Sequence, residues 1–191
     1  GRVSEALKQG KYLNVIVAES ERLTRLVNNV LDFSRMEQGR RRYAIESADL
    51  ARVLREVAEA QRDRLGAAGL TLALAGCDAP VLRPVDRDAV EQVMVNLLDN
   101  AAKYAAAGGE VTVALHAAPG GADITVEDRG PGIAPPHRKR LFESFYRAEC
   151  ELTSHCTGCG LGLSIARRLM RGMGGELLFA PREGGGCRFT L

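Results

Sequence analysis

The first part of the chain has an apolar repeat typical of a helix that packs against another helix. Between Lys11 and Arg35, apolar and small residues recur at alternating intervals of three and four positions, at Leu13, Ile16, Ser20, Leu23, Val27, Val30 and Ser34. This spacing predicts a helix that ends near Gly39 and has a narrow heptad seam, with a partner helix on that seam. An amphipathic helix packed on its own domain is the alternative.

The rest of the chain mixes helical and strand patterns. Two apolar helices are predicted to follow Asp49 and Asp86, because an aspartate can accept hydrogen bonds from the first backbone amides of a helix. The other predicted elements are strands near Tyr43–Glu46, Leu70–Ala75, Val81–Val85, Glu110–His116, Asp123–Glu127, Glu176–Ala180 and Cys187–Leu191, and helices near His137–Phe142 and Leu161–Met170. We therefore expect an α+β domain whose strands pair antiparallel, preceded by a helical arm.

Composition excludes several classes of protein. The 191 residues are 46% apolar and 26% charged with a net charge of +2, a balance that does not favour nucleic acid as a partner. No apolar run approaches the roughly 20 residues of a membrane helix, so we expect no membrane contact here, although a longer parent could be anchored in the inner membrane. The odd count of 5 cysteines favours a reducing, cytoplasmic setting.

The predicted helix Ala89–Tyr104 carries polar side chains on one face. Asn96, Asn100 and Lys103 lie at positions i, i+4 and i+7, which a helix brings to the same side. An amide oxygen is a hard ligand that suits Mg²⁺, and a nearby lysine can neutralise phosphate. The pattern indicates a magnesium and phosphate site, with a cap or an internal hydrogen-bond network as the alternative.

A glycine turn follows the strand that ends near Asp128. An aspartate at a strand end can accept a hydrogen bond from an exocyclic amine such as that of adenine. Gly130 and Gly132 come directly after it, and residues without a side chain let a base approach the backbone. An ordinary turn is the alternative.

The segment Leu141–Arg147 combines aromatic and basic residues. Phe142 and Phe145 are predicted to be core anchors, and Arg147 can reach a terminal phosphate. An exposed arginine without such a role is the alternative.

Three alternating glycines, Gly158, Gly160 and Gly162, come directly before a predicted helix. Backbone N–H groups at a helix start bind anions, and the helix dipole favours negative charge there. The run is not a Walker loop, because no Gly-Lys-Ser/Thr follows it, nor is it G-x-G-x-x-G after a strand.

In this order and spacing, the four segments closely resemble the N, G1, F and G2 boxes of histidine kinases, whose wider family includes gyrase-type ATPases and Hsp90-like chaperones. The resemblance covers roughly Leu50–Leu191 and implies a two-layer α/β sandwich of the Bergerat type. The helix Lys11–Gly39 resembles the second helix of the kinase dimerisation domain. The implied organisation is a partial dimerisation helix at 1–39, a linker at 40–48 and an ATP-binding catalytic domain at 49–191.

The resemblance implies a role for each matching residue. Asn100 would hold Mg²⁺ with help from Asn96, Lys103 and Arg147 would contact phosphate oxygens, and Asp128 would bind the adenine amine. Asn96, Lys103 and Arg147 are the implied catalytic residues. The loop between Arg147 and Gly158 would be a lid over ATP. The other implied ATP-binding positions are Tyr104, Gly130, Gly132, Ile133, Phe145, Gly158, Gly160, Leu161, Gly162 and Leu163.

The implied activity is that of an ATP-dependent protein-histidine kinase. The γ-phosphoryl group would pass to a histidine and then to an aspartate on a response regulator receiver domain, in a homodimeric parent. None of His116, His137 and His155 has the His-Glu-x-x-x-Pro context of the family's acceptor, so we expect a truncated chain that binds ATP and does not autophosphorylate unaided. A serine kinase or ATPase of the same superfamily and a non-catalytic nucleotide-sensing scaffold are the alternatives.

Cysteine stands at positions where family members often have Ser or Thr. These positions are Cys159 and Cys187. Cys150, His155, Cys156 and Cys159 could together hold Zn²⁺ or form a disulfide that pins the lid. Simple replacement of serine by cysteine is the alternative.

Overall fold

The computed structural model describes residues 20, 23–24, 27, 29–38, 41–148 and 160–191. The chain divides into two compact units, Gly1–Arg41 and Arg42–Leu191, each described by itself. In the first unit, residues 29–37 are helical, as the heptad spacing predicts. Leu23, Val27 and Val30 of the seam are exposed, which fits a surface that packs against another helix. No helix among the described residues is long and apolar enough to cross a membrane.

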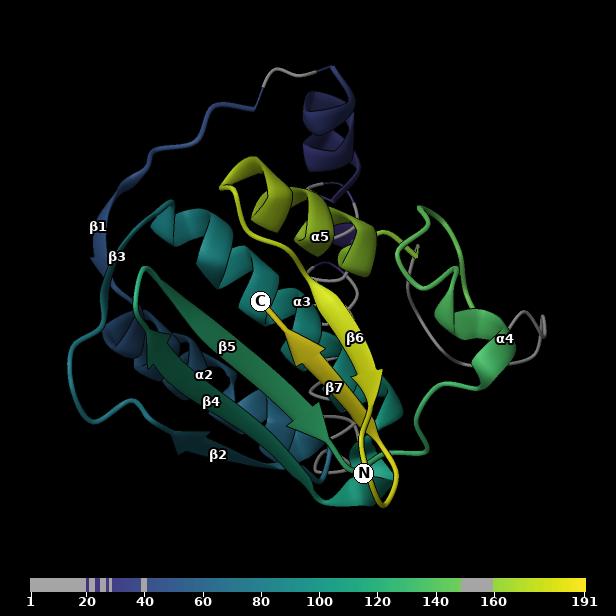
Figure 1. Cartoon of the computed structure of the whole chain (residues 1–191). Coiled ribbons are helices and arrows are strands. Elements are labelled where there is room, and N and C mark those ends of the chain that lie inside the picture. Colours follow the sequence, from purple (N-terminus) through teal and green to yellow (C-terminus); the bar gives the residue numbers. More distant parts are fainter. Residues whose placement is uncertain (1–19, 21–22, 25–26, 28, 39–40, 149–159) are drawn as a thin grey trace, which may run out of the picture. The chain divides into compact units, whose positions relative to one another are not determined.

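In the described part of the second unit, helices α2, α3 and α5 lie against a five-stranded sheet (Figure 1). This arrangement confirms the expected two-layer α+β fold. In chain order the elements are β1 (Glu46–Asp49), α2 (Leu50–Ala67), β2 (Thr71–Ala75), β3 (Leu82–Val85), α3 (Arg87–Tyr104), η1 (Ala106–Gly108), β4 (Glu110–Ala118), β5 (Gly121–Asp128), α4 (Pro135–Arg138), α5 (Gly162–Gly172), β6 (Leu178–Pro181) and β7 (Cys187–Thr190).

The strand order of the main sheet is β2-β4-β5-β7-β6, while β1 and β3 form a separate antiparallel pair. Within the main sheet β2 and β4 run parallel, with Thr71 beside Glu110. The expectation that all strands pair antiparallel is therefore wrong for β2. The chain passes through β3 and α3 between these two strands, and a connection of that length allows them to run parallel. The alternation of apolar and polar residues does not reveal the direction in which two strands pair.

Both long helices begin where the aspartates predict. Asp49 accepts a hydrogen bond from Ala51 N at 3.1 Å, and Asp86 accepts one from Ala89 N at 3.0 Å. The second oxygen of Asp86 accepts from Ala44 N at 3.1 Å. One carboxylate therefore caps α3 and also holds the segment that leads into β1.

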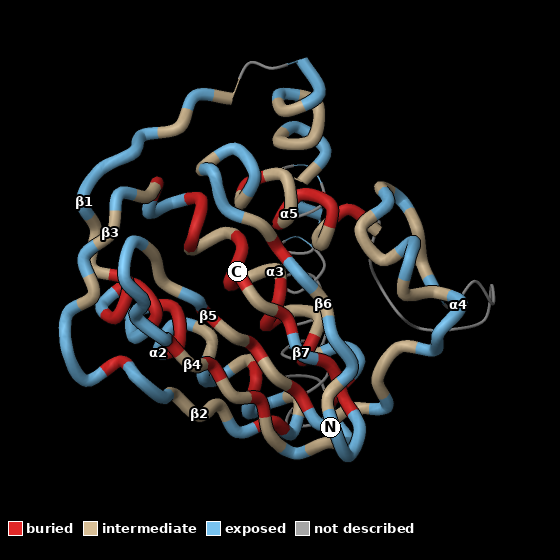
Figure 2. The backbone as a smooth tube through the Cα atoms, in the orientation of Figure 1, coloured by how far each residue is buried: buried red, intermediate tan, exposed pale blue. Residues whose placement is uncertain are grey.

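Alternate residues of the sheet form the core with the helices (Figure 2). The buried sheet residues include Val111, Val113, Leu115, Ile124, Val126 and Phe189, and the buried helix residues include Leu54, Leu65, Met94, Leu97, Leu98, Ile165 and Leu169. Residues two apart in a strand point to the same face. Asp128, two positions after Val126, therefore enters the buried side of the sheet.

Two short elements differ in position from their predictions. The strand expected at Tyr43–Glu46 begins only at Glu46, because the amide of Ala44 bonds to Asp86 and is not free for a strand partner. The helix expected near His137–Phe142 is the single turn Pro135–Arg138. Proline suits the first turn of a helix, which places the start earlier than expected.

Candidate functional site

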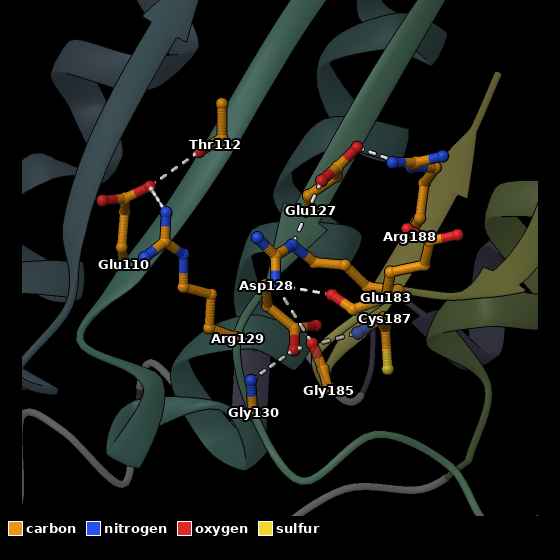
Figure 3. Close-up of polar contacts among 11 residues, drawn as sticks. Glu110, Thr112, Glu127, Asp128, Arg129, Gly130, Glu183, Gly185, Cys187 and Arg188 are labelled. Carbon is orange, nitrogen blue, oxygen red and sulfur yellow. Dashed lines mark hydrogen bonds and ion pairs between the residues drawn. The ribbon is translucent and has the colours of Figure 1, made fainter.

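Asp128 ends β5, and backbone groups hold its carboxylate in place (Figure 3). The oxygen Oδ1 accepts hydrogen bonds from Gly130 N at 2.9 Å and from Cys187 N at 3.2 Å. The residue is 9% exposed. Two donors on one oxygen fix the orientation of the group, and the remaining lone pairs of a carboxylate can accept from a ligand.

The thiol of Cys187 lies in the same place and stays protonated. Burial raises the pKa of this thiol to about 12, and the negative charge of Asp128 adds to the shift. A protonated thiol is a weak donor and a poor nucleophile. Cys187 therefore contributes a polar contact to the site and has little reactivity.

Two backbone segments, the turn Gly130–Gly132 and the residue Gly186, pack so closely beside Asp128 that they require glycine. A Cβ at Gly130 would lie 2.8 Å from the Cβ of Ala105, and one at Gly132, where φ is +73°, would lie 3.2 Å from Gly186 O. Gly186 has φ of +99°, and a Cβ there would overlap the carbonyl oxygen of Asp128. The approach of these segments leaves a surface of bare backbone around the carboxylate.

Helix α3 brings a buried amide to the start of α5. The Nδ2 atom of Asn96 is buried and has no hydrogen-bond partner among the described residues. A Cβ at Gly162, the first residue of α5, would lie 3.6 Å from Oδ1 of Asn96. A buried donor without a partner costs about 1–3 kcal/mol, a cost that a ligand oxygen accepting from this amide would remove. Asn100 is half-buried and Lys103 exposed on the same helix.

The N-terminus of α5 has no side-chain cap in the described structure. Ser164 Oγ donates to Leu161 O at 2.9 Å, so its hydroxyl proton points away from the amides of the first turn. Open amides at a helix start attract anions. Asn96, in the middle of α3, lies beside these amides at Gly162, so an anion at the start of α5 could accept from both.

Phe145 and Gly160 join the segments on either side of residues 149–159. Phe145 N donates to Gly160 O at 2.9 Å, and Phe145 has a positive φ of 65°. The prediction that Phe145 is a core anchor is wrong, because its side chain is 61% exposed. Phe142 is half-buried, and the guanidinium of Arg167 lies 4.7 Å from its ring centroid.

The structure brings the predicted residues together in two groups. Asp128, Gly130 and Gly132 form the first group, and Gly130 contacts Ala105 just after the end of α3. Asn96 and Gly162 form the second. Asn96 lies nine residues before Ala105, and helical rise separates such positions by about 14 Å. A ligand along α3 could therefore touch both groups.

The other predicted residues are less informative. Leu161 is buried, Ile133, Arg147 and Leu163 are half-buried, and Tyr104 is exposed. The remaining predicted positions, Gly158, Cys150, His155, Cys156 and Cys159, lie outside the described residues, so the zinc or disulfide hypothesis stays a prediction. Among the described residues, no cluster of His, Cys, Asp and Glu could hold a metal ion.

Sequence reasoning missed the part played by the turn between β6 and β7. Gly186 packs against Asp128, and Cys187 N donates to it. The run Gly184–Gly186 is typical of a turn, but local sequence carries no sign of a partner that lies 59 residues away.

Two family models match this chain. The model of histidine kinase-, DNA gyrase B- and HSP90-like ATPases matches residues 85–191, and that of the His Kinase A (phospho-acceptor) domain matches residues 3–39. The sensor protein SrrB of Staphylococcus aureus (strain N315) is 30% identical over 191 residues, which are 100% of this chain and 33% of SrrB. The chain thus spans about a third of the length of the curated relatives it matches.

Two solved structures share the fold of this chain. Full-length ShkA in complex with AMPPNP matches with a TM-score of 0.78 and 32% identity, over 96% of this chain and 38% of that chain. The Acinetobacter baumannii histidine kinase AdeS matches with a TM-score of 0.73 and 27% identity, over 93% of this chain and 81% of that chain.

Proposed function

Because this chain belongs to the family of histidine kinase-, DNA gyrase B- and HSP90-like ATPases, we propose that it is the ATP-binding catalytic part of a sensor histidine kinase. It transfers the γ-phosphoryl group of ATP to a histidine imidazole, for relay to an aspartate on a response regulator receiver domain. The whole protein acts as a homodimer, in keeping with the His Kinase A match over residues 3–39. The observation that carries the proposal is the Asp128 carboxylate, held by two backbone amides beside bare glycine backbone.

The fixed carboxylate suits the base of ATP. The lone pairs of Asp128 that no backbone amide uses can accept a hydrogen bond from the 6-amino group of adenine. A base with an oxygen at that position would present an acceptor to an acceptor, which is unfavourable. The glycines on either side of Asp128 allow a flat ring to lie against the backbone.

The polar face of α3 suits the phosphates and their metal ion. Asn100 would hold Mg²⁺ through its amide oxygen, with help from Asn96, and the ion would supply neutralisation of phosphate charge. The buried Nδ2 atom of Asn96 supports a phosphate oxygen beside this helix, because an amide N–H group donates to anions and this one has no partner in the described structure. Lys103, Arg147 and the amides at the start of α5 bind phosphate oxygens, so the work of the chain is positioning and charge neutralisation.

The phosphorylated histidine is not one of the three in this chain. His116 lies in β4, and Nδ1 of His137 lies 2.6 Å from Tyr146 Oη. The third, His155, lies outside the described residues, and none of the three stands in a His-Glu-x-x-x-Pro sequence. We therefore propose that the acceptor histidine comes from a separate segment with that motif.

Calorimetric titration with Mg·ATP and Mg·ADP tests the proposal. Saturable binding is expected, and Asp128→Asn should weaken it by about tenfold or more, because the amide can no longer offer two acceptor oxygens. Asp123→Asn is the matched control, since Asp123 is an exposed carboxylate on the same strand. Unchanged affinity in Asp128→Asn would contradict the proposed site. Binding without transfer to a supplied acceptor helix would favour the non-catalytic scaffold.

A further inference from the structure

Glu127 precedes Asp128 on β5, and its carboxylate is held by two arginines (Figure 3). Arg182 Nε lies 3.3 Å from Oε2, and Arg188 Nε lies 2.5 Å from Oε1. Arg182 follows β6, whereas Arg188 is the residue of β7 directly opposite Glu127. One side chain thus links β5 to both sides of the turn between β6 and β7.

The side chain of Arg182 also binds the turn between these two arginines, which backbone hydrogen bonds from Arg182 N to Gly186 O and from Gly185 N to Arg182 O close at 3.2 Å each. The three glycines of the turn, Gly184–Gly186, have φ values of +80°, +101° and +99°. A glycine run of this kind has many conformations open to it when nothing restrains it. The guanidinium of Arg182 donates to the carbonyl oxygens of Glu183 and Gly185 at 3.2 and 3.3 Å. The same group therefore binds the turn and Glu127 together.

This glycine turn also fixes the orientation of the Asp128 carboxylate. Cys187 N, directly after the glycines, donates to Oδ1 of Asp128, and Gly186 packs against the carbonyl oxygen of that residue. A shift of the turn would move this donor away from the carboxylate. The side chains of Arg182 and Glu127 are 25% and 26% exposed, so solvent screens their interaction less than that of a fully exposed pair.

We propose that Glu127, held by Arg182 and Arg188, is a positioning residue for recognition of the base. It holds the glycine turn so that Cys187 N orients Asp128 toward an exocyclic amine. The inference rests on the proposed nucleotide-binding function and goes beyond it, because it assigns base selectivity to a residue on the opposite face of the sheet from the base. Glu127 therefore influences discrimination between bases and leaves the phosphate contacts unchanged.

The test compares two nucleotides that differ only at the amine. Affinities of the 191-residue chain for ADP and for purine riboside diphosphate, which lacks the 6-amino group, are measured by calorimetry with Mg²⁺. Glu127→Ala should reduce the preference for ADP by about three- to tenfold, through weaker ADP binding alone. Arg182→Ala should do the same, and the double variant should lose little more, because the two residues act together.

Glu56→Ala is the matched control. Glu56 lies on α2 and is also held by two arginines, Arg52 at 2.8 Å and Arg87 at 2.5 Å, but it has no contact with the turn. Its removal should leave the preference for ADP unchanged. Glu127→Gln, which keeps the shape of the side chain and removes its charge, replaces Glu127→Ala if that variant fails to fold.

The outcomes separate this inference from the proposed function. If the unsubstituted chain prefers ADP and the Glu127 variants weaken both nucleotides equally, or neither, the positioning role is overturned while the nucleotide site stands. If the unsubstituted chain binds neither nucleotide, the proposed function and this inference both fall. A selective loss of ADP affinity in the Glu127 variants, absent in Glu56→Ala, supports the inference.

Discussion

Cys187 N donates a hydrogen bond to Oδ1 of Asp128 at 3.2 Å. This bond joins the start of β7 to the end of β5 and makes the carboxylate part of a structure built by distant segments. The orientation of Asp128 therefore depends on the turn before β7 as much as on its own strand.

Gly186→Ala should disturb both stability and nucleotide binding. The new methyl group would overlap the carbonyl oxygen of Asp128 at a backbone φ of +99°, and strain with steric conflict should lower the free energy of unfolding by about 2–4 kcal/mol. Gly184→Ala, at φ of +80° with only an ordinary contact to Arg182 Nη1 at 3.9 Å, should cost only about 1–2 kcal/mol. Urea denaturation and ADP titration measure both. Equal costs at the two positions would show that the close contact is unimportant.

Asn96→Leu should separate stability from binding. Its Nδ2 atom is buried without a partner in the described structure, so an apolar side chain of similar size should leave the nucleotide-free protein as stable or stabilise it by about 1 kcal/mol. Nucleotide affinity should fall. Asp99→Ala should act in the opposite sense, because Asp99 pairs with Arg64: stability falls while affinity holds. Thermal unfolding with and without ADP gives both quantities, and a destabilised Asn96→Leu would argue against an amide reserved for a ligand.

Stability should also fall in acid as Glu176 becomes protonated. Hydrogen bonds from Arg167 at 2.7 Å and Arg171 at 2.9 Å lower the pKa of Glu176 from 4.5 to about 2. A depressed pKa gives a contribution that is complete above pH 4.5 and is lost as the pH falls toward 2. Between these pH values, the free energy of unfolding should depend less on pH in Glu176→Gln than in the unsubstituted chain. Glu59→Gln, which breaks a more exposed pair with Arg62, is the control, and identical acid profiles for the two variants would refute this.

Cys187 should resist alkylation while the protein is folded. Because burial raises the pKa of this thiol from 9.0 to about 12, folding keeps the proton, and this contribution to stability is complete below pH 9 and is lost as the pH rises toward 12. Iodoacetamide at pH 8, followed by mass spectrometry of the peptide that contains Cys187, should find modification only in denaturant. Rapid labelling of the native chain would show that the thiol is accessible and ionised.

Much of the fold follows from local sequence, because its causes are local. Asp49 and Asp86 can cap a helix within three residues, and alternation along β4 and β5 reports one buried face. The parallel pairing of β2 and the exposure of Phe145 could not be predicted in this way, since each depends on how distant segments meet.

The same distinction between local and distant causes applies to the residues of the candidate site. The Asp128 and Asn96 motifs were visible because their chemistry lies within a few neighbouring residues. The contributions of Gly186, Cys187 and Glu127 were not, because each acts through a partner elsewhere in the chain. A glycine run predicts a turn, but it does not say what the turn touches.

Asp86 has a mechanical consequence. Its two oxygens serve separate tasks, one at the first turn of α3 and one at the amide of Ala44. The segment before β1 is therefore bonded, through Asp86, to the N-terminus of the helix that carries Asn96. Displacement of Ala44 would break a hydrogen bond to the same carboxylate that caps α3, so Asp86 links the entry of the chain into this unit to the first turn of that helix.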